Sequence, residues 1–121
     1  MRAETKQHST AVKKFKQALE TGKLDPAGET VAHVTIGKVY AMSRKNEEAL
    51  AAANAAIDAA QIAGTQTLSD PLQLRGLLRR NTGDLDGALT DYRALTQLHP
   101  DMSQFAQVVA DIELEITQTK Q

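Results

Sequence analysis

The chain has no cysteine and no tryptophan among its 121 residues. Without cysteine there can be no disulfide, no iron–sulfur cluster and no zinc site built on thiolates. Aromatic residues make up only 3% of the chain, as two phenylalanines and two tyrosines. The core must therefore be built from Ala, Leu, Val and Ile, which pack best where helices approach closely.

A strong net charge is also missing. The 14 basic side chains nearly balance the 15 acidic ones, for a formal net charge of -1. Such a chain has no global field to attract nucleic acid or an anionic membrane. The weakly polar run 49–63 is interrupted by Asn54, Asp58 and Gln61, and the polar first ten residues lack the apolar stretch of a secretory signal. We expect a soluble protein with no nucleic-acid partner and no direct membrane insertion. The cytoplasm is favoured, with the periplasm or a place within a larger protein left open.

Helix-breaking residues divide the chain at regular places. Gly22 and Gly64 are placed to end helices, and Asp25-Pro26 is typical of a helix start. Between the breaks, apolar residues recur every three or four positions, and no segment alternates with period two. The pattern predicts a single all-α domain over residues 1–121 with about six helices. The expected helices are 10–21, 27–42, 47–63, 72–80, 85–98 and 102–117.

Three of these helices share one internal spacing. Their aligned residues are Ala11, Phe15 and Ala18; then Ala49, Ala53 and Ala56; and then Ala88, Tyr92 and Leu95. The first members of the three sets lie 38 and 39 residues apart. Gly37 and Gly76 precede the second and third sets, where a small residue lets the first helix of a hairpin touch the second at Ala49 and Ala88. This self-similarity predicts stacked helical hairpins.

On these residues the chain resembles the tetratricopeptide repeat family. The matching positions are Ile36, Gly37, Tyr40 and 48–50 in one copy, and 83–89, Tyr92, Leu98 and Pro100 in the next. The resemblance implies an α-solenoid of stacked antiparallel hairpins. Its parts would be an N-terminal half repeat over 9–24, full repeats over 27–64 and 70–100, and a capping helix over 101–118.

The resemblance has departures. The repeats exceed the family's usual length of roughly 34 residues by about four or five. Arg75 and Arg79 fall where the family pattern has an apolar and an aromatic residue. We expect that helix to be rotated, so that Leu74, Leu77 and Leu78 make its packing contacts instead.

Residues typical of catalysis are scattered. His8, His33 and His99 fall on three separate elements, and no two have metal-ligand spacing on one helix face. Glycines occur singly, so no phosphate-binding loop is present, and the carboxylates mark helix starts or solvated faces. We expect no enzyme, no catalytic residue, no metal and no cofactor.

The first helices of stacked hairpins line a concave side, which is where such repeats bind other proteins. Outward positions of these helices give a candidate peptide-binding groove, with an apolar floor and a basic edge at Lys38 and Arg80. The expected partner is a peptide or helix segment of another protein. Packing of Val31, Val34 and Leu77 against flanking helices is the alternative interpretation. The candidate groove residues are Val34, Lys38, Met42, Gln73, Leu77, Arg80 and Asn81.

A basic patch is a second candidate binding surface. Arg75, Arg79 and Arg80, with Lys38, would form a basic patch for a phosphate or acidic peptide. The favoured alternative is a solvated face balanced by acidic residues, which are Asp84, Asp86 and Asp91.

Self-association is the alternative to partner binding. The first helix has no preceding partner helix, which leaves Val12, Phe15 and Leu19 as a candidate assembly surface. The Ala-rich surface over 49–60 would also allow another subunit to approach closely. A homo-oligomeric scaffold therefore stays open.

Overall fold

The computed structural model describes the backbone of residues 3–120 and the side chains from Ser9 onward. This part of the chain forms six α-helices and one short 3₁₀ helix, with no strand, which confirms the predicted all-α class. The first helix begins at Ala3 rather than Thr10, and the fourth begins at Ser69 rather than Leu72. The elements are α1 (Ala3–Glu20), α2 (Pro26–Met42), α3 (Asn46–Ala63), η1 (Thr65–Thr67), α4 (Ser69–Asn81), α5 (Leu85–Leu98) and α6 (Ser103–Thr119).

Aspartates start two of the helices. The Asp25 carboxylate accepts a hydrogen bond from the Gly28 N–H at 2.7 Å, and Pro26 occupies the first helical turn of α2. The Asp84 carboxylate accepts from the Gly87 N–H at 3.0 Å at the start of α5. These bonds satisfy backbone donors that have no partner within the helix, so both helices begin at defined residues.

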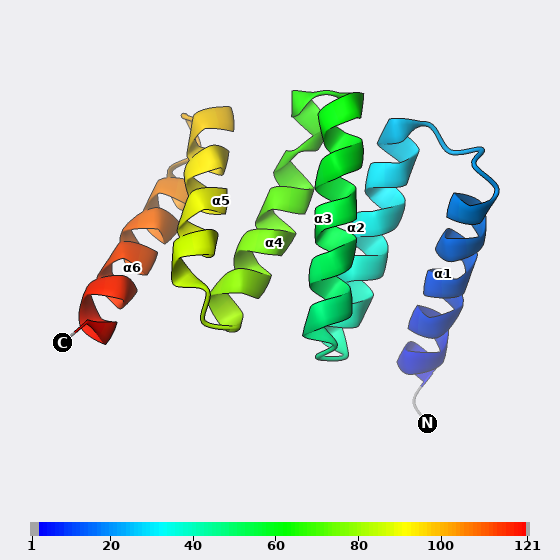
Figure 1. Ribbon diagram of the computed structural model, residues 1–121, viewed down its shortest axis with the longest axis horizontal. Helices are drawn as coiled ribbons and strands as arrows, with labels where there is room; N and C mark the ends of the chain where they lie inside the picture. Colours follow the sequence, from blue (N-terminus) through cyan, green and yellow to red (C-terminus); the bar gives the residue numbers. More distant parts are fainter. Residues whose placement is uncertain (1–2, 121) are drawn as a thin grey trace.

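The helices follow one another in a single row, with α1 and α6 at opposite ends (Figure 1). The most extensive contacts join helices that are neighbours in the chain, and α2 and α4 also contact each other. Helices α2 and α3 form one antiparallel hairpin, and α4 and α5 form the next. The chain is thus built as stacked helical hairpins, in which each element packs mainly on its sequence neighbours.

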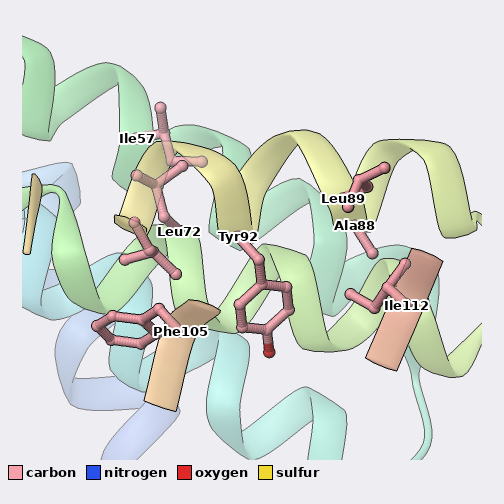
Figure 2. Packing of buried hydrophobic residues seen from close by; sticks show 8 residues of the cluster. Ile57, Leu72, Ala88, Leu89, Tyr92, Phe105 and Ile112 are labelled. Atoms are coloured by element: carbon pink, nitrogen blue, oxygen red, sulfur yellow. The ribbon is translucent and has the colours of Figure 1, made fainter. Parts of the chain in front are cut away.

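The main hydrophobic core lies between α3, α4, α5 and α6. Figure 2 shows Phe105 and Ile112 of α6 among the side chains of α5 and α4, and Tyr92 lies at the centre. Leu95 and Ile112 are completely buried. The C-terminal helix is therefore held by the same core that joins the second hairpin.

A smaller apolar cluster joins the two hairpins. Leu74 and Leu78 of α4 pack against Ala49 and Ala53 of α3, where the small alanines leave room for leucine side chains. The expectation that Leu77 packs beside them was wrong, because 49% of its surface is exposed. Leu77 lies on a different face of α4, which is open to solvent.

Two glycines allow the close helix contacts. A Cβ on Gly37 would lie 3.4 Å from the Ala49 carbonyl oxygen, so the predicted contact with Ala49 is confirmed. The nearest atom would be the Leu74 Cδ2 of α4 at 2.7 Å, so Gly37 also makes room for the next hairpin. A Cβ on Gly76 would meet three ring atoms of Tyr92, the nearest at 2.8 Å. Gly76 therefore faces α5 as expected, but its nearest neighbour is Tyr92 rather than Ala88.

We expect Gly76→Ala to destabilise the protein by about 1–2 kcal/mol. The clash with the buried Tyr92 ring costs roughly 1–3 kcal/mol, while replacing a helical glycine by alanine returns up to about 1 kcal/mol. Urea unfolding followed by circular dichroism measures the change. Adding Tyr92→Leu should remove the extra cost of the alanine. An alanine that stabilises the wild-type protein would contradict the close contact.

Candidate functional site: a groove between α2 and α4

A hollow of about 460 Å³ opens between α2 and α4, the first helices of the two hairpins. Met42 on α2 and Leu77 on α4 border it, with 61% and 49% of their surfaces exposed. The hollow thus offers two large apolar side chains beside polar groups. Its lining residues are Lys38, Ala41, Met42, Asp70, Gln73, Leu74, Leu77 and Tyr92.

A second hollow, of about 320 Å³, lies further toward the start of α2. Lys38 and Asp70 line both hollows, so the two adjoin and form one groove, which we call the α2–α4 groove. Val31 borders the second hollow and is 60% exposed. The groove therefore has apolar side chains at both ends and two charged residues between them. The second hollow is lined by Ala27, Thr30, Val31, Val34, Thr35, Lys38, Thr67 and Asp70.

Five of the seven predicted groove residues line this groove. Lys38, Met42, Gln73 and Leu77 border the first hollow, and Val34 borders the second. Val34 is only 7% exposed, since it packs inward at the base of the hollow. The exposed apolar contact at that end is Val31, one turn earlier on α2.

Arg80 and Asn81 lie outside the linings of these two hollows. The Arg80 Nε donates to the Glu115 Oε1 at 2.9 Å, and its Nη2 bonds the same oxygen. This hydrogen bond raises the pKa of Arg80. The expected basic edge is corrected accordingly: Lys38 is its groove residue, because Glu115 of α6 draws Arg80 away. Asn81 is the exposed last residue of α4.

Arg75 and Arg79 do not form an open basic patch. The alternative, a face balanced by acidic residues, is confirmed for Asp84 and Asp91, but the pairing with Asp91 is buried rather than solvated. Both guanidinium groups point to Asp91 of α5, whose side chain is 1% exposed. Arg75 reaches the Asp91 carboxylate through Nη2 at 2.8 Å and Nε at 3.0 Å, and Arg79 reaches it through Nη1 at 3.2 Å. We call these three residues the Asp91 triad.

The Asp91 triad also holds a third helix. The Arg75 Nη1 donates to the Asn54 Oδ1 on α3 at 2.9 Å, so one side chain of α4 is bonded to both α3 and α5. The Arg79 Nε lies 3.7 Å from an Asp84 carboxylate oxygen at the start of α5. Such pairs satisfy buried charge rather than offer it to a ligand.

The histidines do not gather into a site. His33 is half-buried; burial lowers its pKa and the nearby Glu29 opposes that shift. The His99 Nε2 lies 3.1 Å from the Ser69 Oγ, a pair that the sequence pattern did not predict because 30 residues separate the two. The Ser69 hydroxyl also accepts from Gln73 at 3.3 Å. The side chain of His8 lies outside the described residues.

Among the described residues, no group of three or more His, Asp or Glu side chains is arranged to hold a metal ion. The backbone of His99 is held as well, because its N–H donates to the Leu95 carbonyl and its carbonyl accepts from the Met102 N–H at 3.0 Å. The Ser69–His99 pair joins the start of α4 to the end of α5.

Of the two candidate assembly surfaces, the one on α1 is partly exposed and the one on α3 is mostly buried. Val12, Phe15 and Leu19 are half-buried on the side of α1 that carries its apolar stripe. The Ala-rich surface of α3 is not available as expected, because six of its alanines are buried within the protein. These are Ala49, Ala52, Ala53, Ala56, Ala59 and Ala60.

No protein-family model matches the chain, and a search of curated proteins gives no significant match. Across the described helices, none combines the length and the apolar character needed to cross a membrane.

Proposed function

We propose that the protein is a non-enzymatic interaction module that binds a peptide or helix segment of another protein in the α2–α4 groove. The observation that carries this proposal is the open apolar surface at both ends of the groove. Met42, Leu77 and Val31 each leave about half or more of their surface exposed there, at 61%, 49% and 60%. A concave apolar surface with a few polar groups is the usual form of a binding site.

The tetratricopeptide resemblance supports the same proposal. In a solenoid of this kind the first helices of successive hairpins face one another across a concave surface. Helices α2 and α4 hold those places here and border the groove together. Val31, Lys38 and Met42 are spaced seven and four residues apart, so one face of α2 carries all three along the groove.

That spacing defines the ligand. An amphipathic helical segment with apolar side chains about three turns apart would place them at Val31 and at Met42 with Leu77, because 11 residues of α2 separate Val31 from Met42. The side chains of Lys38 and Asp70 make no hydrogen bond or ion pair in the described part of the chain, and they line both hollows. Polar or charged residues in the middle of the segment would therefore be accepted.

A display library of helical peptides, selected against the wild-type protein, tests the proposal. We expect Met42→Asp and Leu77→Asp each to weaken binding of the selected peptides about tenfold or more, because a carboxylate replaces an apolar contact. Ile62→Asp is the matched control, since Ile62 is 78% exposed on α3 and borders neither hollow. Far-UV circular dichroism checks that all three variants remain folded.

The proposal fails if the library yields no binder. It also fails if the two groove variants bind the selected peptides as tightly as the Ile62→Asp control does.

A further inference from the structure

The two ends of the helix row carry apolar faces that their own neighbours leave partly open. On α1, the apolar stripe is covered by α2 only in part, and each of its members is half-buried rather than buried. Lys16 ties the helix to α2, because its ammonium donates to the Tyr40 hydroxyl at 2.6 Å and lies 5.2 Å from the ring centroid. The stripe comprises Ala11, Val12, Phe15, Ala18 and Leu19.

On α6, the face opposite the core is open. Phe105 and Ile112 point into the core (Figure 2), so residues on the other side of the helix face outward. Ala106, Ala110 and Leu114 are exposed there and lie four residues apart, which makes one continuous row. Leu114 keeps 58% of its surface exposed.

The two faces carry opposite charge. From Ser9 to Glu20, α1 has three lysines and one acidic residue. At about 100° per residue, Lys14 and Lys16 flank the apolar stripe, whereas Lys13 lies on the opposite side of the helix. The Lys14 side chain is exposed and has no hydrogen bond or ion pair in the described part. Helix α6 has three acidic residues and no basic one. Asp111 and Glu113 flank the exposed row of α6; the bridge from Glu113 to Arg93 is more than half exposed and contributes little.

We propose that copies of this chain associate head to tail, with α6 of one copy packed lengthwise against α1 of the next. The helices have 17 and 18 residues, so at about 1.5 Å per residue their lengths match. Each hairpin consists of a first and a second helix, as in α2–α3 and α4–α5. By this alternation α6 is a first helix without a second one after it, and α1 is a second helix without a first one before it, among the described elements. Their pairing between copies continues the row of alternating helices across the contact.

Such a contact joins two different surfaces, so it does not close on itself in a dimer. Each added copy leaves one α1 face and one α6 face free at the ends of the assembly. The average mass should therefore rise continuously with protein concentration. Because lysines face carboxylates across the contact, added salt should lower the mass.

Light scattering on two end-blocked variants tests the proposal. Lys14→Glu blocks the α1 face by charge reversal. Ala110→Gln with Leu114→Gln blocks the α6 face by replacing its apolar row with bulky neutral amides, which add no charge to attract the lysines of α1. All three positions are exposed, and circular dichroism checks that both variants fold. We expect each variant alone to associate with its own copies about tenfold or more weakly than wild type does. It should therefore remain at the 13.1 kDa monomer at concentrations at which wild type assembles.

An equimolar mixture of the two variants should form a species of twice the monomer mass, with one copy of each variant and nothing larger. Each mixed dimer has one intact α6 face joined to one intact α1 face, and its two free ends are both blocked. The proposal is overturned if wild type stays monomeric at all concentrations. It is equally overturned if either variant self-associates like wild type, or if the mixture stays monomeric.

Association between copies should not depend on the α2–α4 groove. Met42 and Leu77 lie between the two ends of the row, so Met42→Asp and Leu77→Asp should leave the wild-type dependence of mass on concentration unchanged. If these variants abolish association, the contact between copies runs through the α2–α4 groove and the head-to-tail assignment is wrong.

Discussion

Asp91→Asn should lower the free energy of unfolding by about 3–5 kcal/mol, the largest single effect we expect in this protein. The Asp91 carboxylate is 1% exposed and accepts hydrogen bonds from Arg75 and Arg79. The amide that replaces it carries no charge and turns two donors of its own toward the guanidinium groups. Two partly buried cations, 20% and 24% exposed, then lose the Asp91 charge, and only Arg79 keeps a nearby carboxylate, that of Asp84 at 3.7 Å. Urea unfolding monitored by circular dichroism gives the loss.

Asp58→Asn is the matched control for this substitution. Asp58 is exposed on α3 and belongs to no ion pair in the described part of the chain, so its change should stay within about 0.5 kcal/mol. If Asp91→Asn costs no more than this control, the buried pairing does not stabilise the fold.

Replacing the whole Asp91 triad by apolar residues separates pairing from packing. Exchange of Asp91, Arg75 and Arg79 for leucine or methionine removes every charge together, which in other buried networks is often neutral or stabilising. We therefore expect the triple variant to be more stable than Asp91→Asn alone. The comparison shows how much of the loss comes from cations left without a partner.

The sequence was enough to predict the helices and acidic partners for these arginines, but not a buried network that also bonds α3. Arg75 and Arg79 are four residues apart on α4, which places both on one face, while Asp91 lies on the next helix. Ion pairing between helices depends on how α4 rotates against α5, and a one-dimensional pattern does not contain that rotation. One feature did point to it. Asp91 lies three residues after Ala88 and four before Leu95, so an acidic residue interrupts the buried stripe of α5.

The packing of the helices also explains which residues of the α2–α4 groove could be predicted from the sequence and which could not. Lys38, Met42, Gln73 and Leu77 could be assigned to a groove because the repeat spacing gives the outward face of each first helix. Asp70 was missed as a lining residue because Asp-Pro is typical of a helix start, and here it also faces α2. Arg80 was assigned wrongly because its partner, Glu115, comes from α6 and is 35 residues away.

Ile112→Ala should cost about 2–5 kcal/mol, because removing a fully buried branched side chain loses its burial and leaves a cavity. Ile112 is 0% exposed and joins α6 to the main core together with Phe105. Leu114→Ala on the same helix is the control, since its side chain is 58% exposed. We expect the control to change stability by about 0.5 kcal/mol or less. Both are measured by urea unfolding at low protein concentration.

The position of a destabilising substitution along the row of helices should decide which helices unfold first. In stacked hairpins each helix is stabilised mainly by its neighbours, so a weakened terminal helix can separate while the rest stays folded. Ile112→Ala should therefore lose hydrogen-exchange protection first in α6. Asp91→Asn, in the middle of the row, should weaken α3, α4 and α5 together, because the triad bonds all three. Equal loss of protection along the whole chain in Ile112→Ala would mean that α6 is an inseparable part of one cooperative core.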